Sequence, residues 1–123
     1  MSGKESQDSS NFEQTKVWND ATDLALMVYG ITKNFPSNEQ FGMVSQLRRA
    51  VVSVSTNFAE GYGHTSKNDK KHFYVIAYGS LLEVKSLLYL SKKLEFINDL
   101  DAVDNKINEI RIQINAIRKS LSQ

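Results

Sequence analysis

Residues 45–61 read SQLRRAVVSVSTNFAEG, a stretch that predicts one helix with three differently composed faces. At about 100° per residue its apolar side chains fall within one arc, which holds Val44, Leu47, Val51, Val54, Phe58 and Tyr62. A nearly opposite arc is polar and holds Gln46, Arg49, Ser53, Asn57, Glu60 and His64. Small or short side chains run between the arcs at Ser45, Val52, Thr56, Ala59 and Gly63. Because such a helix has more than one surface to cover, we expect it to inform both architecture and assembly.

Length and composition favour a single globular domain. The chain has 123 residues, of which 41% are hydrophobic and 24% charged, and a chain of this size buries one core. We expect residues 1–11, which are polar and lack a secretory signal, to form a disordered tail and residues 12–123 to form the domain. A net charge of +1 supplies no global attraction to nucleic acid or to an anionic membrane. The absence of cysteine excludes disulfides and thiolate sites and fits a cytoplasmic location.

The segments on either side of this stretch also predict helices. Residues 13–33 carry apolar side chains at alternating steps of 4 and 3, and Pro36 ends that helix. Ser37 with Gln40 has the spacing of a capping box for the helix that contains residues 45–61. Gly61 and Gly63 suit a left-handed cap at its other end.

Two further helices are expected in the second half of the chain. Ser66 with Asp69 predicts the start of a helix that reaches about residue 93 and is apolar on most of its circumference, so central packing or a subunit contact is expected and a membrane span is not. Asn98 or Asp99 can cap a last helix, whose apolar seam continues to Leu121. Four helices with short connections predict an all-α fold, an antiparallel up-down-up-down four-helix bundle.

Several segments together resemble a known family. They read KVW at 16–18, NFP at 34–36, EQFG at 39–42, SQLRRA at 45–50, NFAEG at 57–61 and AYGS at 77–80, followed by Glu83. Their order and spacing over roughly residues 12–97 resemble the small four-helix bundle proteins typified by the 23S rRNA intervening-sequence protein, with the accessory variability proteins of diversity-generating retroelements as relatives. Ser55 and Phe58 depart from the residues that many members carry, Pro and Ile, without affecting the expected fold.

The resemblance implies a bundle that closes into a ring of five subunits, with an activity that is unassigned for most members. Retroelement relatives are strongly basic and resemble partners of nucleic acid and of a reverse transcriptase. This chain is nearly neutral. We therefore expect a bacterial-type, non-enzymatic homo-oligomeric scaffold or adaptor with itself as the partner, and keep an RNA-binding or DNA-binding accessory protein as the alternative. A reverse transcriptase is expected as a partner only if one is encoded beside this chain.

The polar arc of residues 45–61 is a candidate subunit interface or channel lining. The residues predicted there are Gln46, Arg49, Ser53, Asn57 and Glu60, joined by Tyr74, Tyr78 and Glu83 of the next helix. An ordinary solvated helix face is the alternative, although such faces contain more Lys and Glu than this one. Glu83 has apolar neighbours in the sequence, so we expect its carboxylate to be hydrogen-bonded between two helices rather than to be catalytic.

Basic residues form the candidate nucleic-acid contacts. Lys67, Lys70 and Lys71 stand at the start of a helix, where the helix dipole disfavours cations, so some other group is expected to compensate them. In a ring of five they would form a belt that could bind phosphate; a solvated turn is the alternative. Arg48 and Arg49 make a second candidate patch, or serve subunit contacts.

Titratable residues predict neither a metal site nor an active site. Glu60 and His64 are four residues apart and lack the Glu-x-x-His spacing of di-metal bundles, and His72 has no companion ligands. No nucleophile, metal constellation or phosphate-binding loop is recognisable in the sequence. We therefore expect no catalytic residue, no metal and no cofactor.

Overall fold

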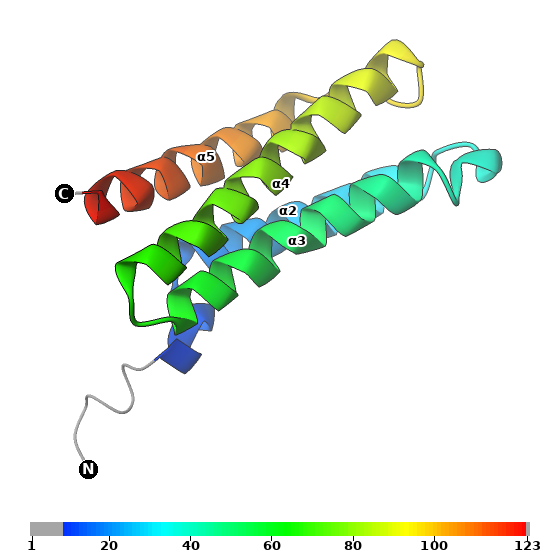
Figure 1. Cartoon of the computed structure of the whole chain (residues 1–123). Coiled ribbons are helices and arrows are strands. Elements are labelled where there is room, and N and C mark those ends of the chain that lie inside the picture. The colour runs from blue at the N-terminus through cyan, green and yellow to red at the C-terminus, as the bar shows by residue number, and fades with distance from the viewer. Residues whose placement is uncertain (1–8, 123) are drawn as a thin grey trace.

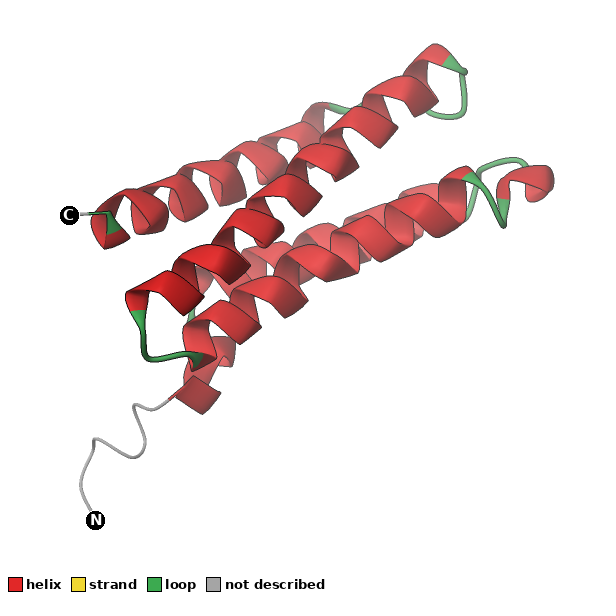
Figure 2. Cartoon of the chain, in the orientation of Figure 1, coloured by secondary structure: helices red, strands yellow, loops and turns green. Residues whose placement is uncertain are grey.

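The computed structural model describes residues 9–122 of the chain. Four long helices dominate it: α2 (Lys16–Thr32), α3 (Met43–Gly63), α4 (Lys67–Lys93) and α5 (Asp101–Leu121). Two short 3-10 helices, η1 (Ser9–Gln14) and η2 (Ser37–Glu39), precede α2 and α3. Figure 2 shows helices joined by short loops, and the described residues contain no strand.

The four helices form an antiparallel up-down-up-down bundle, as predicted (Figure 1). α3 packs against α2 and α4, and α5 packs against α2 and α4, so α2 and α4 are diagonal to each other. Side chains from all four helices meet in one core, the largest of them being Leu24, Leu47, Phe58, Leu81, Leu88, Ile107, Ile110 and Ile114. The outward faces of α2 and α4 consequently point to opposite sides of the molecule.

α2 begins three residues later than the sequence predicts. Thr15 is its cap, because the Thr15 hydroxyl accepts a hydrogen bond from the Trp18 N–H at 3.2 Å. η1 occupies the preceding residues, and Phe12 packs edge to face on Trp18 with ring centroids 5.3 Å apart. Most of the predicted tail, residues 1–11, lies outside the described residues.

The predicted start of α3 is wrong. Ser37 opens η2 rather than α3, and the long helix begins only at Met43. There the Glu39 carboxylate accepts the Met43 N–H at 3.1 Å and takes over the role of a cap. Phe35 is buried and packs on Phe96 at 5.4 Å, which fixes this end of the bundle.

The predicted left-handed glycine cap at the end of α3 is also wrong. No glycine among residues 9–122 has a positive φ, and α3 stays helical through Gly63. Gly61 has a different role, since a Cβ at this position would lie 2.6 Å from Cε1 of Tyr74. Gly61 therefore lets α3 and α4 approach closely where they cross.

The ends of α4 and α5 agree better with the sequence. The Ser66 hydroxyl accepts the Asp69 N–H at 3.1 Å and caps α4, as predicted. α4 ends where Glu95 adopts a left-handed φ of 66° and the Phe96 N–H bonds back to the Ser91 carbonyl at 2.9 Å. Leu100 precedes α5, and the Asp99 carboxylate accepts the Asp101 N–H at 2.9 Å, so Asp99 stabilises the start of α5 from one residue earlier than a standard cap.

Candidate oligomer interface

An apolar stripe runs along the outward face of α4. We call this set, whose side chains are 38–50% exposed, the α4 stripe; it comprises Val75, Ile76, Leu82, Tyr89, Leu90 and Leu94. At about 100° per residue these positions lie on the side opposite the buried residues Ala77, Leu81, Val84 and Leu88. α4 is therefore apolar on both sides, and this chain covers only one of them.

By length and composition α4 is the one described helix that could cross a membrane. The core helix of a globular protein can have the same length and composition. In α4, 33% of the most apolar 18-residue segment is buried inside the bundle. The polar contacts that α4 makes with α3 and α5 suit a packed helix.

A hollow of about 540 Å³ opens on the C-terminal half of the α4 stripe. It is lined by Leu82, Lys85, Ser86, Tyr89, Leu90 and Lys93, and we call it the α4 hollow. Tyr89 is held in place by a hydrogen bond from its hydroxyl to the Asp104 carboxylate at 2.9 Å. That hydrogen bond, with some burial and the Asp104 charge, raises the pKa of the Tyr89 phenol. The wall of the hollow is thus fixed by a contact with α5.

Part of the polar arc of α3 is used inside the chain. The Ser53 and Ser80 hydroxyls are hydrogen-bonded at 2.8 Å across the α3–α4 contact. The Asn57 amide donates to the Ser53 carbonyl and to the Ser53 hydroxyl, both at 2.9 Å. Ser53 therefore joins α3 to α4, and Asn57 supports it from the same helix. Both predicted interface residues are half-buried.

The other polar interface candidates lie on the surface. Gln46, Arg49 and Glu60 are exposed on α3. Glu83 is exposed on α4, so the expectation that its carboxylate is hydrogen-bonded between two helices does not hold within one chain. All four side chains are accessible to a second molecule.

The tyrosine predictions need correction. Tyr74 is only 3% exposed and stacks on Phe58 at 5.4 Å, so it belongs to the core and is inaccessible to another subunit. Burial, with a smaller contribution from Tyr62, raises the pKa of Tyr74 to about 12. Tyr78 faces α5, where Arg118 lies 5.0 Å from its ring centroid.

Arg48 is occupied within the chain. Its Nε donates to the Thr32 hydroxyl at 3.1 Å, and its guanidinium lies 4.5 Å from the Tyr29 ring centroid. The Thr32 hydroxyl in turn donates to the Val28 carbonyl at 2.8 Å. Arg48 thus fastens α3 to the last turn of α2, while Arg49 beside it points outward and is exposed.

The lysines at the start of α4 do not form one cluster. Lys70 Nζ donates to the carbonyls of Gly61 at 3.2 Å and Tyr62 at 3.0 Å in the last turn of α3, where the Gly61 carbonyl also accepts the His64 N–H. Burial lowers the pKa of Lys70. The negative end of α3 thus compensates the charge of Lys70 at the positive end of α4. Lys67 is exposed and Lys71 half-buried.

His64 and Glu60 are linked through the backbone, since His64 Nδ1 lies 2.7 Å from the Glu60 carbonyl oxygen. Residues 9–122 contain no group of three or more His, Asp or Glu side chains placed to hold a metal. Both residues line a hollow of about 420 Å³ beside Phe12 of η1, whose floor includes Thr56, Ala59 and Gly63. η1 therefore lies beside part of the face of α3 that carries small side chains.

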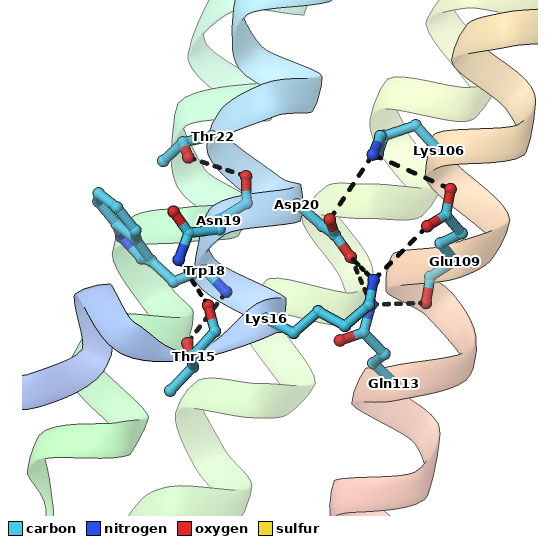
Figure 3. A network of polar contacts seen from close by, with 9 residues as sticks. All are labelled: Thr15, Lys16, Trp18, Asn19, Asp20, Thr22, Lys106, Glu109 and Gln113. Carbon is cyan, nitrogen blue, oxygen red and sulfur yellow. Dashed lines mark hydrogen bonds and ion pairs between the residues drawn. The ribbon is translucent and has the colours of Figure 1, made fainter.

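A polar network between α2 and α5 escaped the sequence interpretation (Figure 3). Asp20 is 7% exposed and receives Lys16 Nζ at 2.7 Å, the Gln113 amide at 2.8 Å and Lys106 Nζ at 3.6 Å. Burial works to raise the pKa of Asp20, but these donors and charges outweigh it and hold the pKa below its ordinary value. An acidic residue between the seam positions Val17 and Ala21, four residues after a lysine, was the available signal.

Comparison with known proteins supports the resemblance. No curated protein matches the chain. A family model described as 23S rRNA-intervening sequence protein matches residues 13–116, which include α2, α3, α4 and most of α5. The chain belongs to the 23S rRNA-intervening sequence protein family.

Proposed function

We propose that this protein is a non-enzymatic, homo-oligomeric scaffold or adaptor, a ring of five subunits, in which copies cover one another's α4 stripe. The observation that carries the proposal is the set of six apolar side chains on α4 and at its C-terminal end, each 38–50% exposed on the side away from the core. Contiguous apolar surface of this kind marks interaction sites rather than ordinary solvent-exposed surface. The resemblance to the family, set out in the sequence analysis, implies a ring of five subunits.

The stripe can supply part of one face of a subunit contact. It runs from residue 75 to residue 94, so at about 1.5 Å per residue it is about 30 Å long and, with a width of about 10 Å, offers about 300 Å². Each partner in a stable interface contributes about 800 Å². The polar residues Gln46, Arg49 and Glu60 of α3 and Glu83 of α4 are exposed and available for a polar rim.

Solution mass tests the proposal. Light scattering or native mass spectrometry at micromolar concentration should give a multiple of 13.9 kDa, and Leu82→Glu should shift the mass to that of one chain because a carboxylate would be buried in the contact. Ile112→Glu on α5 is the matched control, since Ile112 is 60% exposed on a polar face. A parent chain that runs as a monomer would refute the proposal.

Nucleic-acid binding remains the second function to test. Arg48 and Lys70 are engaged within the chain, so Arg49, Lys67 and Lys71 are the predicted contacts that face outward or lie at the surface. Retention on RNA or DNA that weakens steeply with salt, and that is reduced in Lys67→Ala/Lys71→Ala, would favour it. Absence of retention at low salt would exclude it.

A further inference from the structure

The connection between η2 and α3 presents an aromatic side chain to solvent. Phe41 is 96% exposed, the most exposed large apolar residue among residues 9–122. The surrounding backbone is held in place, because the Gly42 N–H bonds to the Glu39 carbonyl at 3.1 Å and the Glu39 carboxylate accepts the Met43 N–H. Phe41 is thus an apolar knob on an ordered loop, and aromatic anchors of this kind dominate the energetics of interfaces.

The α4 hollow has the properties of a receptor for such a knob. Its volume is about 540 Å³, and Leu82, Tyr89 and Leu90 give it apolar walls. Phe41 presents about 200 Å² of surface, which its own copy would bury in the hollow of the neighbouring copy.

Charge and position also match. Glu39 lies two residues before Phe41, whereas Lys93 lines the hollow together with Lys85, which pairs with Asp104 at 3.8 Å, so an acidic residue beside the knob would face a lysine of the receptor. The loop before α3 and the C-terminal end of α4 lie at the same end of the bundle (Figure 1). In a ring whose bundles stand parallel, neighbouring knobs and hollows are therefore at the same height.

We infer that Phe41 of one copy inserts into the α4 hollow of the next copy. Knob and hollow belong to different hairpins of the same chain, so each copy can use its knob on one neighbour and its hollow on the other; such a head-to-tail contact is the type that closes into rings. This inference rests on the proposed homo-oligomer and adds its anchor residue, its receptor and its direction.

The absence of cysteine from the chain permits a direct cross-linking test. Phe41→Cys and Ser86→Cys place one thiol on the knob and one in the hollow. Mixed under mild oxidation, the two single variants should give a covalent dimer, whereas each variant alone should stay uncross-linked. The double variant should give a ladder that ends at the size of the native assembly. Ile112→Cys paired with Phe41→Cys is the control and should not cross-link.

A second measurement uses Phe41→Ala, which cannot disturb the core because the side chain is exposed. The dissociation constant of the assembly, measured by dilution, should rise at least tenfold in Phe41→Ala. Ile112→Ala should leave it unchanged. An oligomeric parent whose cysteine pair fails to cross-link, or whose mass is unaffected by Phe41→Ala, would overturn the anchor and leave the scaffold proposal intact. A monomeric parent would overturn both.

Discussion

α4 and α5 are both long helices with apolar residues at steps of 3 and 4, yet the chain covers them differently. α5 buries a narrow seam of Val103, Ile107, Ile110 and Ile114 and exposes one large apolar residue, Ile112. α4 buries a comparable set and exposes a second apolar face, the α4 stripe. Four helices can cover an arc as narrow as that of α5. The wider arc of α4 exceeds what one bundle can bury, and this excess is the basis of the proposed assembly.

The largest expected effect contrasts the α5 seam with the α4 stripe. Ile110→Ala should lower the free energy of unfolding by about 3 kcal/mol, because it empties a fully buried site. Leu82→Ala should change it by less than about 0.5 kcal/mol per chain, since the side chain is 43% exposed, and should act on association instead. Urea unfolding at several protein concentrations separates the two effects. Equal losses for both variants would mean that the two faces do not differ.

The next effect concerns the inner face of α4. Gly61→Ala should destabilise the chain by about 2 kcal/mol, because the new Cβ would lie 2.6 Å from Cε1 of Tyr74 and force α3 and α4 apart. Gly30→Ala is the control, since nothing lies within 4 Å of a Cβ there, and it should stabilise α2 by up to about 1 kcal/mol. Thermal unfolding of both variants measures the difference. A neutral Gly61→Ala would show that this crossing is loosely packed.

A smaller effect concerns the polar contacts that Asp20 of α2 makes with α5. The folded-state pKa of Asp20 lies below its ordinary value of 3.8, so its ion pairs stabilise the fold above that pH and are lost as pH falls through the folded-state pKa. Asp20→Asn should lower the free energy of unfolding by about 1 kcal/mol at pH 7. It should also make that free energy fall less steeply as the pH is lowered. Urea unfolding of both proteins, repeated at intervals from pH 7 to pH 3, checks this. If the free energy of unfolding falls as steeply at acid pH in Asp20→Asn as in the parent chain, other carboxylates cause the pH dependence.

The smallest effect is a gain at the end of α4. Glu95 holds a left-handed φ of 66°, which costs a side chain energy that glycine does not incur. Glu95→Gly relieves this cost but gives the unfolded chain more conformational entropy, which offsets part of the gain. The free energy of unfolding should therefore rise by about 0.5 kcal/mol. Glu95→Ala is the control and should not give this gain. Destabilisation by glycine would indicate that the Glu95 side chain contributes to the connection.

Helix existence and the core were predictable, but helix ends were less so. The seam of α5 and the Ser66 cap follow from local spacing, and both are found as predicted. The start of α3 was not predictable, because Ser37 and Gln40 have a capping spacing while Glu39 makes the bond that matters. Gly61 likewise suits a local turn in the sequence, and only its contact with Tyr74 shows its role.

The candidate site was predictable in outline and not residue by residue. Excess apolar surface on α4 followed from the composition of residues 73–90, in which Glu83 and Lys85 are the only charges. The burial of Tyr74 did not, because an apolar pattern that surrounds a helix does not say which side meets the core. The engagement of Arg48 and Lys70 depends on carbonyl and hydroxyl partners in neighbouring helices, which spacing along one helix does not reveal.

The sequence by itself determined the number of helices, their amphipathic seams and the antiparallel bundle, because periodicity and short connections are local properties. The tertiary structure decided which polar groups are paired inside the chain, which tyrosines are buried and where apolar surface stays uncovered. Those outcomes depend on contacts between segments far apart in the sequence, such as Asp20 with Gln113, 93 residues later. Burial and pairing are properties of the packed whole.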